Sequence, residues 1–89
     1  MTQICFSPSF KRAFKKRVAG RTDLEERFWR RVEIFTGNPF DPRLRTHKLS
    51  GKLQELWSFS LEYDLRVVFC FLPQNRVMFE DIGTHDEIY

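Results

Sequence analysis

Three closely spaced strands in the last third of the sequence constrain the fold more than any other feature. Residues 56–61 alternate between large apolar side chains and serines, the period of a strand with one buried face. Residues 65–72 are rich in β-branched and aromatic side chains and predict a strand buried on both faces. Residues 76–82 predict a third strand, and residues 83–89 predict a polar tail after it. Because short polar turns join the three, we expect an antiparallel meander.

Two helices are expected before the meander. Ser7 and Pro8 predict the start of an amphipathic helix, with serine as the cap and proline at the first helical position. Its apolar stripe is surrounded by lysines and arginines, and Gly20 ends it. Thr22 and Glu25 have the spacing of a capping box and predict the start of a second helix.

The order of these elements predicts an α+β fold. We expect an N-terminal strand at residues 3–6, followed by a two-helix hairpin that packs on one face of a twisted antiparallel sheet of about four strands. A chain of 89 residues has room for one core, so residues 1–89 are expected to form a single domain.

The net charge of +3 conceals two halves of opposite sign. Residues 1–55 contain thirteen Lys and Arg against six Asp and Glu, a balance of +7, whereas residues 56–89 contain two against six, a balance of −4. A basic surface of this kind suggests a polyanionic partner, nucleic acid above all, and a solvated helix face is the alternative. No apolar run has the length of a membrane span and no secretion signal is evident. We therefore expect a cytoplasmic protein that binds no membrane, with reduced cysteines.

The candidate catalytic residues are few. His47 and His85 are the two histidines, each in a polar context, and neither has a Cys or His partner at the spacing of metal ligands. No metal site and no cofactor are expected. Histidine, carboxylate, arginine and tyrosine side chains on a basic domain suit metal-free cleavage of RNA, in which one group deprotonates the 2′-hydroxyl and another protonates the leaving 5′-oxygen.

Three segments carry a resemblance to a known family: His47-Lys48-Leu49-Ser50-Gly51, the strand start Tyr63-Asp64-Leu65-Arg66, and the ending Gly83-Thr84-His85-Asp86-Glu87-Ile88-Tyr89. Together they resemble the RelE/ParE toxin superfamily, and the Gly-Thr-His ending with an aromatic at the last position is most similar to its YafQ-like ribonuclease branch. The resemblance implies a toxin that cuts mRNA in the ribosomal A site without a metal. It also implies a cognate antitoxin as partner.

The resemblance implies roles for individual residues. It assigns catalysis to His47, Asp64 and His85, with Tyr89 at the position of an aromatic that is usually Phe. We expect His85 to act as general acid and either Asp64 or His47 as general base, although acid and base are interchangeable at this stage. Arg66 is expected to stabilise the phosphate. The expected contacts to the RNA backbone come from three further cations, Arg45, Lys48 and Lys52.

Ser60 departs from the branch, which often has another histidine at this position. A serine hydroxyl is no general base at neutral pH, so the chain has one titratable group fewer. Two other functions stay open, and Ser60 bears on the second of them. One is a non-enzymatic toxin of the ParE kind that inhibits DNA gyrase, and the other is a catalytically weakened RNA-binding relative. Simpler roles also stay open for two residues, since Asp64 can shape a turn and Arg66 can form a structural ion pair.

Overall fold

The structure is a computed structural model that describes residues 1–49 and 55–89. Its elements, in chain order, are β1 (Gln3–Phe6), α1 (Pro8–Arg17), α2 (Thr22–Gly37), the 3₁₀ turn η1 (Pro42–Leu44), β2 (His47–Lys48), β3 (Trp57–Glu62), β4 (Leu65–Leu72), β5 (Arg76–Thr84) and α3 (His85–Ile88).

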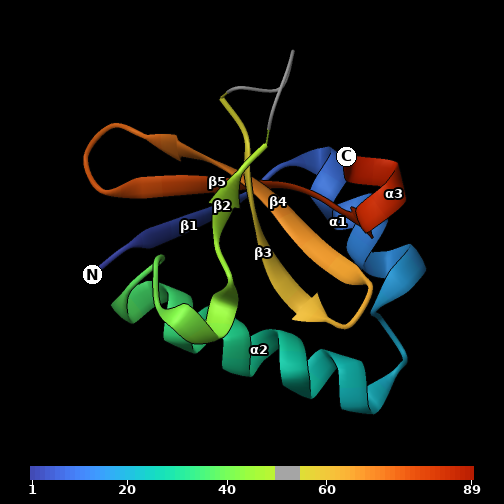
Figure 1. Ribbon diagram of the computed structural model, residues 1–89. Coiled ribbons are helices and arrows are strands. Elements are labelled where there is room, and N and C mark those ends of the chain that lie inside the picture. The colour runs from blue at the N-terminus through green and yellow to red at the C-terminus, as the bar shows by residue number, and fades with distance from the viewer. Residues whose placement is uncertain (50–54) are drawn as a thin grey trace.

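The strands form one twisted sheet in the order β1-β5-β4-β3-β2 (Figure 1). The expected meander of β3, β4 and β5 is confirmed, and each neighbouring pair in it is antiparallel. The expectation of about four antiparallel strands is wrong in two details, because the sheet has five strands and β1 pairs with β5 in parallel. This pairing joins segments about seventy residues apart, as in the register partners Gln3 and Arg76. A tight turn predicts the pairing of adjacent strands, whereas no local signal predicts the pairing of such distant ones.

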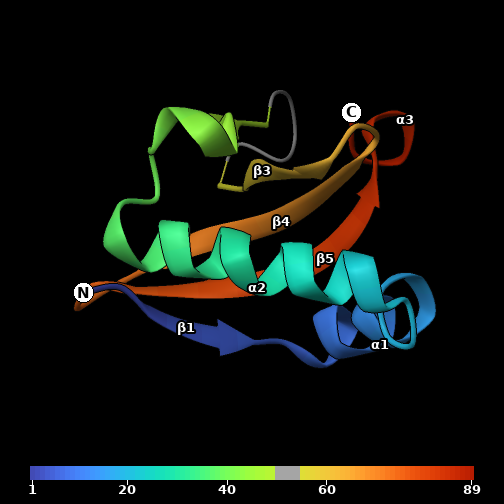
Figure 2. The same cartoon turned by 90° about the horizontal axis from the view of Figure 1, so that it is seen from below.

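The two long helices cover one face of the sheet, as Figure 2 shows, with α2 lying over β4 and β5 and α1 near one end. A cluster of phenylalanines fills the space between the layers. Phe79 of β5 lies at its centre, fully buried, with ring centroids of Phe28, Phe35 and Phe59 within 5.4–6.4 Å. Large rings supply much apolar area from few positions, which suits a core in a chain of this size.

The start of α1 is as expected, whereas the start of α2 is not. The Ser7 hydroxyl accepts a hydrogen bond of 3.0 Å from the backbone N–H of Phe10, and Pro8 follows in the first turn. The capping box expected at Thr22 is wrong, because Arg21 is the N-cap of α2 and no side chain caps that end. The first-turn acids Asp23 and Glu25 still interact favourably with the helix dipole at this end.

The end of the chain forms regular structure where a polar tail was expected. Strand β5 continues to Thr84, and the next four residues form α3. Here the structure does contain a capping box: the Glu87 carboxylate accepts a bond of 2.7 Å from the Thr84 N–H, and the Thr84 hydroxyl accepts one of 3.3 Å from the Glu87 N–H. The cap therefore turns the chain at Thr84 and sends the last residues back over the sheet.

No helix among residues 1–49 and 55–89 combines the length and the apolar character that crossing a membrane requires.

Candidate active site

The candidate site lies on the sheet face that points away from the phenylalanine core. Side chains alternate along β3, so Ser58 and Ser60 face opposite to Phe59, which is fully buried in the core. His47 of β2 is the register partner of Ser58, and Arg66 of β4 is the register partner of Ser60. The edge strand β2 and the interior strands β3 and β4 thus bring a histidine, two serines and an arginine to one face.

A chain of hydrogen bonds joins these residues to the last residue of the sequence. Arg66 Nε donates to Ser58 Oγ at 2.9 Å, and Ser58 Oγ lies 2.7 Å from the Tyr89 hydroxyl. The Tyr89 hydroxyl in turn bonds to His47 Nε2. His47 Nδ1 lies 3.1 Å from the carbonyl oxygen of Arg45. Five residues that are far apart in the sequence are therefore connected by four consecutive contacts.

The two ends of this chain limit the directions that its hydrogen bonds can take. The Arg66 guanidinium can only donate and the Arg45 carbonyl can only accept. With a neutral His47, Nδ1–H donates to the Arg45 carbonyl, Nε2 accepts from the Tyr89 hydroxyl, and the Tyr89 oxygen accepts from the Ser58 hydroxyl. In this tautomer the lone pair is on Nε2, and the 3.4 Å approach of Arg66 Nη2 to His47 Nδ1 is a contact without a shared proton. His47 is thus prepared to accept a proton at Nε2.

The carbonyl of Arg45 anchors both the histidine and the arginine. Besides the bond from His47, it accepts one of 2.9 Å from Arg66 Nη2. Arg45 has a positive φ of 52°, which is uncommon for a residue other than glycine and turns its carbonyl toward the site. The Arg45 side chain is exposed, so this residue contributes its backbone to the cluster and leaves its charge in solvent.

His85 joins the cluster through the ring of Tyr89. The centroids of the His85 and Tyr89 rings are 4.6 Å apart, and those of His47 and Tyr89 are 5.3 Å apart with nearly parallel planes. The structure therefore places both histidines of the chain against one tyrosine. His85 is exposed, and its Nδ1 lies 3.8 Å from a carboxylate oxygen of Asp86.

An ion pair holds α3, and with it Tyr89 and His85, against α1. Arg17 Nη2 lies 2.7 Å from Glu87 Oε2, while the other Glu87 oxygen belongs to the capping box. The pKa of Glu87 is lowered, first by the hydrogen bond from the Thr84 backbone N–H and further by the Thr84 and Arg17 side chains. Ile88 packs on Gly83, where an added Cβ would come within 3.2 Å of the isoleucine side chain.

The other residues expected at the site stand apart from this cluster. Asp64 is an exposed turn residue between β3 and β4, and the hydrogen bonds found among the described residues connect its carboxylate to no member of the cluster. Lys48 points to the opposite face from His47, and its Nζ lies 6.0 Å from the centre of the Trp57 ring. Lys52, like the Ser50-Gly51 pair of the resemblance, lies outside the described residues.

Comparisons with known proteins agree with this arrangement. The family model described as bacterial toxin of type II toxin-antitoxin system, YafQ, matches residues 2–89. The chain belongs to the YafQ toxin family. Compared with curated proteins, the sequence matches none.

Solved structures of related toxins have the same fold as this YafQ family member. A metal-bound toxin from Helicobacter pylori is 26% identical, with a TM-score of 0.79 and full coverage of both chains. YafQ from E. coli strain BL21(DE3) is 17% identical, with a TM-score of 0.72 over 100% of this chain and 99% of that one. The YoeB dimer from Staphylococcus aureus is 16% identical, with a TM-score of 0.76 over 94% and 97%. The last two identities establish the fold alone. Membership of a type II toxin family implies an antitoxin partner.

Sequence reasoning overlooked Ser58 in this YafQ family member. Ser60, the neighbouring serine on the same face, was singled out instead, and among the described residues its hydroxyl donates to the carbonyl of Glu62 at 3.4 Å. Ser58 is fully buried and links Arg66 to Tyr89. The alternation of residues 56–61 did place both serines on the polar face, but the choice between them depends on where α3 lies, and that position was not predictable from the strand pattern.

The described part of this YafQ family member has no evident metal centre. Among residues 1–49 and 55–89, no group of three or more His, Cys, Asp or Glu side chains is arranged to hold a metal ion. The two cysteines, Cys5 and Cys70, are free thiols on different strands.

Proposed function

We propose that the protein is a metal-independent endoribonuclease that cleaves mRNA in the ribosomal A site, as the toxin of a type II toxin–antitoxin pair. The observation that carries the proposal is the directed hydrogen-bond chain from Arg66 through Ser58 and Tyr89 to His47. It presents an imidazole beside a guanidinium on the face of the sheet opposite to the phenylalanine core. Family membership supplies the toxin context, and the resemblance to YafQ-like ribonucleases supplies the reaction class.

The reaction needs two proton transfers and one charge to be stabilised. A base removes the proton of the 2′-hydroxyl, and the resulting oxygen attacks the adjacent phosphorus. The bond from phosphorus to the 5′-oxygen breaks, and an acid protonates that leaving oxygen, which gives a 2′,3′-cyclic phosphate and a 5′-hydroxyl. Negative charge grows on the non-bridging oxygens and requires a cation close by.

The contacts at the site favour His47 over Asp64 as the general base. His47 carries a lone pair on Nε2 because the Arg45 carbonyl holds the proton on Nδ1. In the free protein Tyr89 occupies that lone pair, so the 2′-hydroxyl takes the place of the Tyr89 hydroxyl or passes its proton through it. Asp64 has no corresponding link to the described members of the cluster.

His85 and Arg66 fill the remaining roles. His85 is exposed and lies against the Tyr89 ring, and as imidazolium it can protonate the leaving 5′-oxygen. Arg66 is half-buried and fixed by bonds to Ser58 and to the Arg45 carbonyl, so its guanidinium is positioned before the substrate arrives. A charge held in place in advance stabilises a phosphorane without reorganisation during the reaction.

Inducible expression of the wild type beside His47→Ala and His85→Ala tests the proposal, with primer extension on an abundant message as the readout. We expect growth arrest and cuts in phase with codons for the wild type, and loss of about 10²–10⁴ in cleavage rate for each variant. Asp64→Ala is the matched control that separates the two candidate bases, and we expect it to retain most of the activity.

Two outcomes would contradict the proposal. Cuts that persist at wild-type rate in His47→Ala and His85→Ala would show that the assigned groups do no proton transfer. Growth arrest with intact mRNA, together with inhibited supercoiling by purified DNA gyrase, would show a toxin of the ParE kind instead.

A further inference from the structure

A groove beside the candidate site is lined mainly by arginines. It has a volume of about 640 Å³ and runs from α2 across η1 to the turn between β3 and β4. Five guanidiniums contribute to its wall: two come from α2, two from the segment at η1, and one from β4. They are Arg27, Arg31, Arg43, Arg45 and Arg66. The last two also belong to the hydrogen-bonded cluster, so the groove opens directly onto the site.

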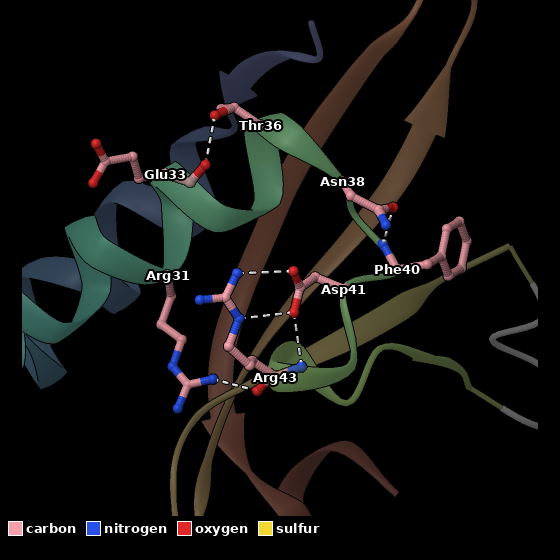
Figure 3. A network of polar contacts seen from close by, with 7 residues as sticks. All are labelled: Arg31, Glu33, Thr36, Asn38, Phe40, Asp41 and Arg43. Carbon is pink, nitrogen blue, oxygen red and sulfur yellow. Dashed lines mark hydrogen bonds and ion pairs between the residues drawn. The ribbon is translucent and has the colours of Figure 1, made fainter.

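Only part of this positive charge is balanced within the described protein. Arg43 is paired, because its Nε and Nη2 donate to the two oxygens of Asp41 at 3.0 and 2.9 Å, as Figure 3 shows. That pairing lowers the pKa of Asp41 to about 2, chiefly through the side-chain hydrogen bond from Arg43. No ion pair among residues 1–49 and 55–89 includes Arg27, Arg31 or Arg45.

The arrangement holds like charges together instead of separating them. Arg31 donates to the carbonyl of Arg43, which keeps its guanidinium against η1 (Figure 3). Its pKa is lowered by burial first and then by the positive charges of Arg27, Arg43 and Arg45. Guanidiniums that repel one another destabilise the free protein, and an anion that enters between them relieves the repulsion. The groove is therefore suited to a ligand with several negative charges.

The rim of the groove suits single-stranded nucleic acid better than an acidic protein. Tyr63 lies at the turn between β3 and β4 and is fully exposed, which offers a free ring face to a base. The planar fork of arginine binds phosphate oxygens in pairs, and a nucleic-acid strand supplies phosphates at regular intervals. An acidic peptide would need apolar anchors as well, and apart from Tyr63 and Pro42 the described lining is polar or charged.

We propose that this arginine groove binds the phosphate backbone of the RNA strand on one side of the cleaved bond, with Tyr63 stacked on one of its bases. The proposal rests on the proposed ribonuclease function for the identity of the strand, because a substrate held at Arg66 must continue in both directions along its chain. The strand would extend from Arg66 toward α2 along the groove, where its phosphates would meet Arg45, Arg31 and Arg27.

A binding experiment with uncleavable RNA tests the groove independently of catalysis. The probe is a fluorescein-labelled oligoribonucleotide of about 12 nucleotides, long enough for a groove of this kind. Its 2′-O-methyl groups remove the nucleophile. Fluorescence anisotropy is measured across a range of salt concentrations for the wild type and for the double variant Arg27→Gln/Arg45→Asn. Asparagine is chosen at position 45 because it tolerates the positive φ found there.

A matched control removes the same charge from elsewhere on the molecule. Arg12→Gln/Lys16→Gln takes two cations from α1, which lies at the opposite end of the molecule from η1 (Figures 1 and 2). We expect the groove variant to lower the salt slope by about 1.4, since each lost phosphate contact on a single strand accounts for about 0.7. That difference corresponds to about 25-fold weaker binding at 0.1 M salt, if the two curves meet near 1 M. The control variant is expected to bind like the wild type.

Tyr63→Leu separates stacking from charge. It should weaken binding of the probe while leaving the salt slope unchanged, because it removes a ring and no cation. A parallel measurement with purified ribosomes identifies the source of the RNA. Loss of affinity for the oligonucleotide supports a message strand, whereas loss for ribosomes alone indicates ribosomal RNA and overturns the assignment to the cleaved strand.

The proposal is wrong if the groove variant binds both oligonucleotide and ribosomes as tightly as the wild type, or if the α1 control loses as much affinity as the groove variant. Reduced affinity for the antitoxin alone would likewise overturn it and make the groove a protein-binding surface. If the groove binds RNA but the wild type cuts no message, the ribonuclease function fails and the RNA groove stands.

Discussion

The two faces of the sheet are held together by different kinds of contact. On one face, phenylalanines from both helices and three strands pack around Phe79, and each ring touches several others. The other face carries the hydrogen-bond chain of the candidate site, in which each side chain is held in position by its neighbours. Its side chains are those of His47, Ser58, Arg66 and Tyr89.

This difference implies different responses to mutation. Loss of a core ring removes dispersion contacts and apolar burial at once, so the whole domain is affected. Loss of one member of the hydrogen-bond chain leaves the core unchanged and alters the position of the next side chain in that chain of bonds. The first face should therefore determine stability and the second activity, and substitutions can test whether the two are separable.

The largest effect on stability is expected from Phe79→Ala. Phe79 is fully buried at the centre of the ring cluster, and a Phe-to-Ala change in such a position destabilises by about 3–5 kcal/mol. Urea denaturation followed by circular dichroism measures the loss. Phe71→Ala is the control, because Phe71 is 41% exposed at the margin of the sheet and should cost clearly less. Equal losses would show that the core is not centred on Phe79.

The largest effect on activity without loss of stability is expected from Tyr89. Tyr89→Phe keeps the ring against both histidines but removes the hydroxyl that joins Ser58 to His47, and we expect cleavage to fall about tenfold, with about 10²-fold for Tyr89→Ala. The free energy of unfolding should change by less than about 1 kcal/mol. Tyr63→Phe is the matched control at the other tyrosine. Wild-type cleavage by Tyr89→Phe would mean that the ring alone matters.

The core face and the polar face also differ in how far they could be predicted. Alternation in residues 56–61 and the apolar character of 65–72 place Phe59 and Phe69 in the core, and both are fully buried. The parallel pairing of β1 with β5 could not be predicted, since it depends on the path of the chain through two helices. Local pattern predicts which side a residue faces, and tertiary path decides which neighbour it meets.

The candidate site could be predicted less completely than the core, because it depends more on the tertiary path of the chain. His47, Arg66, His85 and Tyr89 were singled out from the sequence, and the structure brings them together. Ser58 was missed and the capping box was expected at Thr22, whereas the box that orients the site lies at Thr84 and Glu87. Ser58 and the box at Thr84 were missed for one reason, because the last seven residues were interpreted as a tail. A one-turn helix has too few internal hydrogen bonds to be stable alone, and it forms here through contacts with distant residues.

Ser58→Ala tests whether the members of the hydrogen-bond chain depend on one another. The change removes the hydroxyl that Arg66 Nε and the Tyr89 hydroxyl share. Because Arg66 is half-buried and Tyr89 is exposed, water can reach the two groups left behind, and the cost should be about 0.5–1.5 kcal/mol. Cleavage should fall as well, because Tyr89 no longer holds His47 in one orientation. Ser60→Ala, two residues along the same strand and on the same face, should change the unfolding free energy by no more than about 0.5 kcal/mol. Equal effects of the two substitutions would contradict a special role for Ser58.

The smallest expected effect concerns the ion pair between Arg17 and Glu87, which connects the helical layer to α3. The lowered pKa of Glu87 means that its ionised form stabilises the docked α3. This contribution is complete above the ordinary Glu pKa of 4.5 and is lost as the pH falls through the lower value of the folded state. The methyl signals of Ile88, which packs on Gly83, should therefore shift below pH 4.5 as α3 loosens.

Arg17→Gln should move the midpoint of that Ile88 transition upward toward the ordinary value, because one of the groups that favour ionised Glu87 is gone. Cleavage at neutral pH should fall only about threefold, as expected for a pair whose carboxylate is exposed. Arg12→Gln, in the same groove between α1 and β5 but outside the pair, should leave the midpoint unchanged. An unchanged midpoint in Arg17→Gln would mean that the Thr84 cap alone sets the ionisation of Glu87. In that case α3, and the two site residues it carries, would be positioned independently of the helical layer, and the two faces of the sheet would be uncoupled.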